Sequence, residues 1–452
     1  MLTKTKRLIY AVGRFGSSAL LSLIDIATFW FYLDFLNLGG LLTGIAFALG
    51  KLVIAFFGWY FGYLSDITKS KRWGRRKPYI AAGSFLLALS TIMLFIPQYI
   101  VSVNNTLQLF IYATFFLSLA NLSYGLLSTP YTAWLAEIAE AGERVAVSAY
   151  QNIFSMLAQV VGTLLGFALP ALLVQSPSQM LPILFGLGAF EVLLYLPAVA
   201  RITETDRPMP RPSVRRELAA VLGNRNYRSW LTLQGLMAIP TSILASLILS
   251  YTQKVLGMVG VQYMMMGGLL LLTTMVFFFV WTAASRRWKK KRSILGSLLV
   301  LMLSLPLTLV IGQPVSAFMP LQLQAGLFVA FIAIGLSGWY LLPNPVTADI
   351  AHEDEARRGE ARAGSYVGLI SVPLNILQAL ARFIAGLLAD LPLVAGQTYS
   401  LGLLVWGPLS SLSLIPCFFF LARYVETDPL EGIRGGKPLS TIDRASQTDR
   451  TA

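Results

Sequence analysis

The sequence has one cysteine and one histidine in 452 residues, and charged residues of both signs are scarce. Cys417 has no partner for a disulfide within the chain, and His352 and Cys417 alone cannot form a histidine- or cysteine-based metal site. Charged residues make up 12% of the chain, about half of what is usual in soluble domains. No GxxxxGK[ST] loop occurs, which argues against an ATP-driven pump. We therefore expect no metal and no cofactor.

Hydrophobic residues make up 56% of the chain, and the mean hydropathy is +0.67. Apolar runs of about 20 residues recur from end to end, and such a run is long enough to cross a bilayer as a helix. Because a backbone in lipid must satisfy its own hydrogen bonds, the runs predict an all-α polytopic membrane protein. Twelve transmembrane helices are expected, at residues 8–36, 41–64, 79–99, 107–134, 146–173, 180–200, 228–253, 261–284, 294–312, 322–349, 365–389 and 397–423.

The net charge of +14 is concentrated in alternate linkers between these spans. One cluster lies between Ser65 and Ile80, and a second, SRRWKKKR, occupies residues 285–292. Lys and Arg mark the cytoplasmic side and attract anionic lipid. We therefore expect an inner-membrane or plasma-membrane protein with both termini in the cytoplasm. Membrane lipid is an expected partner and nucleic acid is not.

A Pro- and Arg-rich linker divides the chain near its middle. It separates two halves of six predicted spans each, an arrangement typical of secondary transporters. The expected units are a first half at 1–200, a cytoplasmic linker at 201–227, a second half at 228–424 and a polar cytoplasmic tail at 425–452.

Four spans carry a stripe of polar residues at helical spacing. Polar residues in a membrane usually face the bundle interior or an aqueous cavity. The four stripes together predict a shared cavity, although a single serine is better explained by a hydrogen bond between helices. The candidate substrate-binding residues are Ser18, Asp25, Asn121, Tyr124, Ser128, Asn152, Gln159, Asn375, Gln378 and Arg382.

Charged residues inside the spans are the candidates for coupling. Asp25 and Lys51 lie near the middle of neighbouring spans, where an unpaired charge is expensive. We expect them to pair with each other, or Asp25 to carry a coupling proton. Arg382 is expected either to bind an anionic group or to extend to the membrane interface. A structural role is expected for Glu191.

Three motifs resemble those of a known family. GYLSD at residues 62–66, followed by WGRRKP, resembles the G-x-x-x-D…G-R-[KR] loop of the major facilitator superfamily. LLSTPYTAWLAEIAEAGER at 126–144 and ADIAHEDEARRGEARAGS at 348–365 are similar to segments of the glycoside–pentoside–hexuronide cation symporters, a family that includes melibiose permease. The resemblance covers nearly the whole chain and implies the major facilitator fold and transport by alternating access. By the same resemblance, the cytoplasmic gate consists of Gly62, Asp66, Arg75 and Arg76.

The charged site of the melibiose-transporting members is absent at the matching positions. Its two cation-binding acids fall on Ile54 and Gly58. Sodium coupling is therefore doubtful, because a hard cation prefers carboxylate oxygens. The other charged positions fall on Ser18, Ser128, Asn152 and Asn375.

Together, the residues and the resemblance predict a secondary active transporter for a small polar organic solute, with a sugar or glycoside as the first candidate. Transport is expected to be coupled to protons or to be uncoupled. Two alternatives stay open: a transporter of lysolipids or other amphiphiles, with an anionic head on Arg382 or Lys51, and a membrane assembly or scaffold protein that does not transport. No nucleophile–base pair or metal cluster supports an enzyme.

Overall fold

The computed structural model describes residues 4–68, 74–138, 141–175, 177–202, 214–311, 318–358 and 363–428. The regular structure in these residues is helical, apart from one isolated bridge between Leu393 and Ser400. Eleven segments of the described chain are long and apolar enough to cross a membrane. The expected all-α, multi-pass architecture is thereby confirmed.

Six long helices come from the first half of the chain: α1 (Lys4–Leu23), α2 (Gly40–Ile67), α3 (Lys77–Leu94), α4 (Thr106–Ile138), α5 (Ala141–Gln175) and α6 (Pro177–Arg201). Helix α1 continues through two π-helical turns, Ile24–Thr28 and Phe31–Phe35. The last apolar run before α4 ends in a short 3-10 turn at Pro97–Tyr99. Helix α6 packs on α1, where the buried Glu191 carboxylate lies against Gly16, and this contact fits the structural role expected for Glu191.

The second half begins with a short helix in the expected linker, α7 (Val214–Leu222). The long helices that follow are α8 (Arg225–Lys254), α9 (Val261–Ser304), α11 (Leu321–Leu341), α12 (Pro343–Arg358), α13 (Ala363–Ala389) and α14 (Gly402–Tyr424). Helix α9 continues into a 3-10 turn at Leu305–Leu309.

Helix α9 contains two of the twelve predicted spans, which explains why eleven membrane-length segments are found in the described residues. Its path breaks at Lys289, where φ is 71° and ψ is 156°. The two limbs then lie side by side, because Trp281 of the first limb approaches within 3.4 Å of the Cβ position of Gly296 in the second. The basic cluster at 285–292 therefore forms the tip of a helical hairpin.

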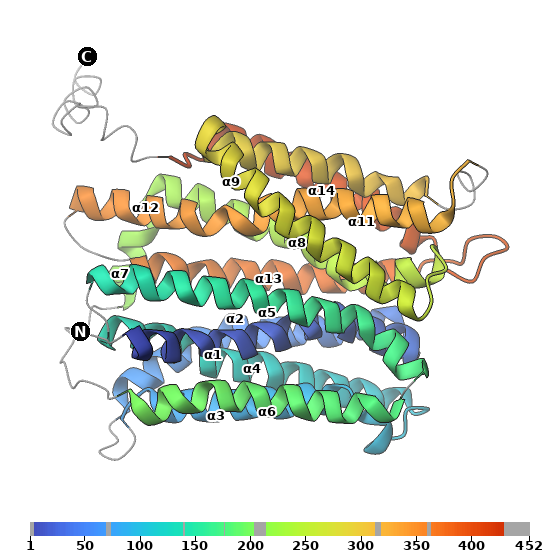
Figure 1. The fold of residues 1–452 in the computed structure, drawn as a ribbon, viewed down its shortest axis with the longest axis horizontal. Coiled ribbons are helices and arrows are strands. Elements are labelled where there is room, and N and C mark those ends of the chain that lie inside the picture. The colour runs from blue at the N-terminus through green and yellow to red at the C-terminus, as the bar shows by residue number, and fades with distance from the viewer. Residues whose placement is uncertain are drawn as a thin grey trace.

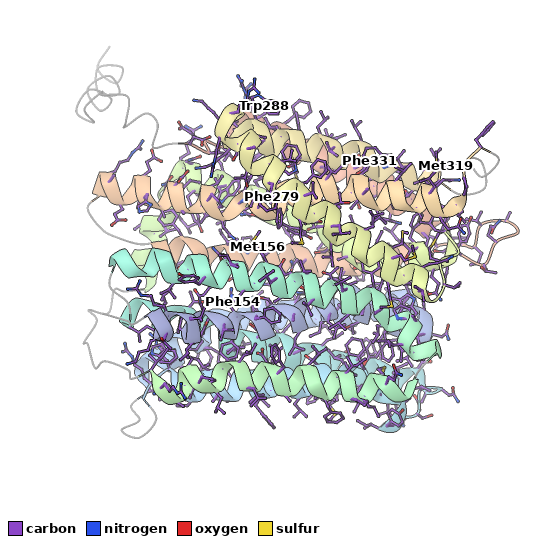
Figure 2. All side chains as sticks on the ribbon, in the orientation of Figure 1. Phe154, Met156, Phe279, Trp288, Met319 and Phe331 are labelled. Carbon is purple, nitrogen blue, oxygen red and sulfur yellow. The ribbon has the colours of Figure 1, made fainter. Side chains whose placement is uncertain are left out.

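The loops define two ends of the bundle, which Figure 1 shows on the left and right. The start of α1, the end of α14, α7 and the tip of α9 lie at one end, here called the basic end. The α1–α2, α8–α9 and α13–α14 connections lie at the other, here called the opposite end. Large apolar side chains such as Phe279, which is 77% exposed, cover the outer surface between the two ends (Figure 2). Such a surface suits contact with lipid.

Candidate substrate and coupling site

A charged triad lies in the interior, between the two halves. The Asp25 carboxylate accepts a hydrogen bond from Arg382 Nη2 at 2.9 Å, and its Oδ1 lies 3.4 Å from Lys51 Nζ. Asp25 comes from the π-helical turn after α1, Lys51 from α2 and Arg382 from α13. The ion pair between Asp25 and Lys51 is one of the two alternatives that the sequence left open for these residues. The triad therefore joins the first half of the chain to the second.

Arg382 is held on several sides. Its Nη1 donates to the backbone oxygen of Asp25 at 3.2 Å and to Ser246 Oγ at 2.8 Å. The guanidinium lies 5.2 Å from the centre of the Phe47 ring, a cation–π distance. Only 2% of the side chain is exposed, so the alternative that Arg382 extends to the membrane interface is wrong. Near the end of α13 the side chain points inward, because Asp25 and Ser246 provide acceptors there.

The position of the triad inside the bundle makes it more significant for function than for stability. A buried ion pair contributes little net stability, because desolvation of both charges offsets their attraction. Removing one partner, however, leaves a buried charge uncompensated and costs roughly 3–5 kcal/mol. Charges retained inside a membrane bundle under these conditions are characteristic of ion and substrate pathways.

The polar stripes meet the triad at one point. Asn121 of α4 lines a small pocket together with Asp25 and Lys51, and its Nδ2 donates to the Leu117 oxygen of its own helix at 2.8 Å. Asn375 of α13 is also buried and bonds within its own helix, to the oxygen of Ser371 at 2.7 Å.

The stripes of α1 and α5 contact each other. Ser18 Oγ and Ser155 Oγ are 2.8 Å apart, and Gln159 Nε2 donates to the same Ser155 hydroxyl at 3.3 Å. Gln159 and Asn152 are exposed on α5. The remaining candidates, Tyr124, Ser128 and Gln378, are half-buried. Their part in substrate binding stays a prediction.

Contacts between the halves close the opposite end, and the sequence reasoning did not identify them. The Asp34 carboxylate, in the second π-helical turn, accepts a hydrogen bond from Ser250 and lies 2.5 Å from Lys254 Nζ. One turn earlier, Trp30 Nε1 donates to Gln253 Oε1 at 2.5 Å. All three partners belong to α8. The one available signal was that Lys254 is the single basic residue in the predicted linkers of this end.

A second closing contact joins α2 to α13. The Asp390 carboxylate accepts hydrogen bonds from the backbone N–H groups of Gly40 at 2.7 Å and Leu41 at 2.6 Å, and thereby caps the start of α2. The two helices cross there through Gly40, Gly44 and Gly386, whose missing side chains allow the backbones to touch.

The expected gate residues lie at the basic end. Arg76 is buried and donates to Ser65 Oγ and, at 3.5 Å, to the Gly62 oxygen, both in α2 of the same half. Arg75 is half-buried. The side chain of Asp66 lies outside the described residues. The role of these residues in joining the halves stays a prediction.

The positions that match the cation-binding acids of the family lie in the packing between α2 and α4. Gly58 accepts a hydrogen bond through its backbone oxygen from Thr129 Oγ1 at 3.0 Å. Ile54 Cγ1 lies 3.5 Å from the Cβ position of Gly125.

Known proteins share this fold and this sequence pattern. A protein of Synechocystis sp. described as an uncharacterized symporter is 29% identical over 225 residues. The match covers 48% of this chain and 41% of the length of that protein, which is about two fifths. The uncharacterized symporter YjmB of Bacillus subtilis is 23% identical over 85% of this chain and 83% of its own.

Solved transporter structures share the fold at low identity. A D-xylose–proton symporter superposes with a TM-score of 0.64 at 13% identity, covering 93% of this chain and 98% of its own. The nucleoside transporter NupG superposes with a TM-score of 0.61 at 15% identity, covering 93% of this chain and 99% of its own. The model of a transporter family described as MFS/sugar transport protein matches residues 9–425. Because that match spans nearly all of the sequence, the chain belongs to the MFS/sugar transport protein family, a family of multi-pass membrane transporters and not of enzymes.

Proposed function

We propose that the protein moves a small polar solute, with a sugar or glycoside as the first candidate, and that Asp25 binds the coupling proton. The observation that carries the proposal is the triad of Asp25, Lys51 and Arg382, which is shared between the halves, with Arg382 buried and the other two residues half-buried. Beside it, Asn121 offers a neutral amide of the kind that recognises hydroxyl groups. Sugar is favoured by the description of the family.

The coupling follows from electrostatics. As a carboxylate, Asp25 attracts Arg382 of α13 and so favours the state in which the opposite end is closed. As a neutral acid, it no longer offsets the two neighbouring positive charges, and the halves separate more easily there. A proton that binds to Asp25 from the opposite side therefore favours opening toward that side, and its release toward the basic end restores the ion pairs that hold the opposite end closed. A site that biases two states in this way is what coupled transport requires.

The orientation of the cycle rests on the charge distribution. The basic end carries the Lys- and Arg-rich linkers, so we place it in the cytoplasm by the positive-inside rule. The α1–α8 and α2–α13 contacts then hold the protein closed on the outer side in the state described here. With Lys51 and Arg382 both facing Asp25, neither is available to an anionic lipid head in this state.

The test is uptake by proteoliposomes of radiolabelled monosaccharides and glycosides, with and without an inward pH gradient. Wild type is expected to accumulate one of these solutes only with the gradient. Asp25→Asn is expected to keep exchange of the solute across the membrane and to lose gradient-driven accumulation. Glu426→Gln is the matched control, because it neutralises an exposed acid at the basic end and keeps the triad and the closing contacts.

Two results would contradict the proposal. Equal gradient-driven accumulation by Asp25→Asn and wild type would remove Asp25 from the coupling step. Failure of wild type to exchange any sugar or glycoside would remove the solute class, whatever the behaviour of the variants.

A further inference from the structure

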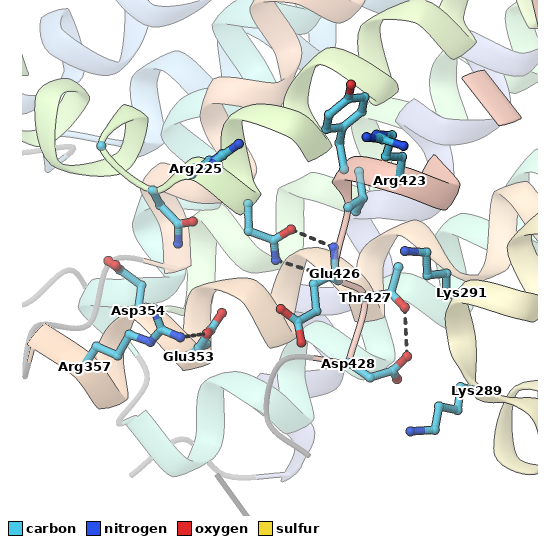
Figure 3. A pocket seen from close by; sticks show the side chains of 15 residues that line it. Arg225, Lys289, Lys291, Glu353, Asp354, Arg357, Arg423, Glu426, Thr427 and Asp428 are labelled. Atoms are coloured by element: carbon cyan, nitrogen blue, oxygen red, sulfur yellow. Dashed lines mark hydrogen bonds and ion pairs between the residues drawn. The ribbon is translucent and has the colours of Figure 1, made fainter. Parts of the chain in front are cut away.

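A large pocket at the basic end lies apart from the triad. It has a volume of about 890 Å³ and is formed within the second half by the start of α8, the tip of α9, the end of α12 and the segment after α14 (Figure 3). Nothing in the transport cycle described above uses it. A cleft of this size suits a small molecule or the head group of a lipid.

Three cations line the pocket without an ion-pair partner among the described residues. They are Arg225 at the start of α8, Lys291 after the tip of α9, and Arg423 near the end of α14. Figure 3 shows that they come from three separate elements around the pocket. Since the three cations repel one another, an anion bound between them would stabilise their positions around the pocket.

The acids of the wall are mostly engaged elsewhere. Glu353 pairs with Arg357, one turn along α12. Asp428 accepts a hydrogen bond from Thr427 at 2.8 Å and lies 3.7 Å from Lys290 Nζ. Glu426 is exposed, and its carboxylate has no ion pair among the described residues. Asp354 is a further, buried acid of the wall. Among the described residues, the three cations without an ion pair thus outnumber Glu426, the acid without one.

Hydrogen bonds hold one wall of the pocket in place. The Asn226 side chain forms two hydrogen bonds with the backbone of Glu426, one to its oxygen and one from its N–H, both of 2.8 Å. These bonds fix the segment after α14 against the first turn of α8. The same turn begins α8 and directs the positive end of its helix dipole to this side. A pocket that is already formed loses little entropy on binding.

We propose that this pocket binds a phosphoryl anion, either the head group of an anionic phospholipid or a free phosphate compound. Three cations and a helix N-terminus match an anion with several acceptor oxygens and more than one charge. The pocket lies at the end of the membrane-spanning helices, where basic residues attract the head groups of anionic lipid.

The experiment measures thermal unfolding of the full purified chain with two probes. Pyrophosphate in detergent tests the free phosphate, and nanodiscs of phosphatidylglycerol, compared with phosphatidylcholine, test the head group. We expect at least one probe to raise the melting temperature. Stabilisation by phosphatidylglycerol alone assigns the site to lipid, and stabilisation by pyrophosphate assigns it to a soluble phosphate.

Variants test whether this pocket is the site. Arg225→Gln combined with Lys291→Gln is expected to weaken binding roughly 25-fold, at about fivefold for each charge. Glu426→Gln is expected to tighten binding by about fivefold, a change that a merely structural role does not predict. Arg292→Gln, an exposed residue of the same α9 tip outside the pocket, is the matched control.

The proposal fails if neither probe stabilises wild type. It also fails if the double variant, with an unchanged melting temperature in the absence of ligand, responds as wild type does. Because the readout is binding rather than uptake, these outcomes are independent of the transport proposal.

Discussion

Alanine at Gly386 is expected to open the opposite end of the bundle. In the closed state, helices α2 and α13 touch through Gly40, Gly44 and Gly386. A Cβ on Gly386 would overlap the backbone oxygen of Gly40 and lie 2.9 Å from Cα of Gly44. Both obstacles are backbone, which cannot rotate away as a side chain can. The two helices must therefore move apart at this crossing.

The size of the effect follows from the cost of overpacking, which is typically 1–3 kcal/mol. This cost falls on the state in which the glycines touch and not on a state in which α2 and α13 are separated there. The equilibrium between the two states is then shifted by the same free energy. We expect the ratio of open to closed molecules at this end to rise about 5- to 150-fold.

The assay is a distance measurement by pulsed electron paramagnetic resonance. Spin labels are attached at Leu107 and Val259, which are 65% and 66% exposed at the opposite end, in the first and second halves. Cys417 is replaced by alanine to remove the native thiol. Gly386→Ala is expected to transfer population to longer distances.

The matched control is Gly268→Ala in α9, whose Cβ would meet nothing within 4 Å. It tests the general effect of replacing a helical glycine by alanine, which by itself is mildly stabilising. If Gly386→Ala gives the same distance distribution as wild type and the control, the glycine crossing does not hold the halves together, and our reasoning about closure is refuted.

Two further variants test single contacts. Asp34→Asn removes the charge that faces Lys254. Because Lys254 is 37% exposed, we expect a smaller shift to the open state in the same spin-label assay, by about 1 kcal/mol or less. A shift larger than that of Gly386→Ala would contradict this ranking. Trp230→Phe loses the 2.9 Å hydrogen bond from Nε1 to Thr347 Oγ1 between α8 and α12. We expect a loss of about 1 kcal/mol in the free energy of unfolding, measured as a lower melting temperature. An unchanged melting temperature would mean that another group satisfies Thr347.

The helices were predictable from hydropathy because lipid imposes a strong and simple rule on the backbone. The ends of the helices were less predictable. Helix α5 begins at Ala141 and α8 at Arg225, several residues before the expected starts of the spans, because the polar turns at the basic end remain helical outside the apolar run. The break of α9 at Lys289 had no conformational signal either, since a positive φ at lysine is uncommon.

The site was predictable in part. Opposite charges near the middle of neighbouring spans are costly unless compensated, and the ion pair of Asp25 and Lys51 is one of the two alternatives that this cost predicted. The third member, Arg382, was recognised as unusual, but its partner was not. Periodicity indicates which residues share a face of one helix. It carries no information on which helix of the other half lies against that face.

The π-helical turns of the first span explain how one helix contacts the second half of the chain through both Asp25 and Asp34. Asp25 and Asp34 are nine residues apart, which is two and a half turns of an ordinary α-helix of 3.6 residues per turn. An unbroken α-helix would therefore direct them to opposite sides. Both residues lie in π-helical turns, whose hydrogen bonds span five residues instead of four. A π-helical turn holds more residues than an α-helical turn, so Asp34 is rotated back toward the face of Asp25. Both acids can then contact cations of the second half, Arg382 at the triad and Lys254 at the opposite end. The same helix thus carries the proposed proton site and a closing contact, so a change of charge at Asp25 acts on the element that also closes the opposite end.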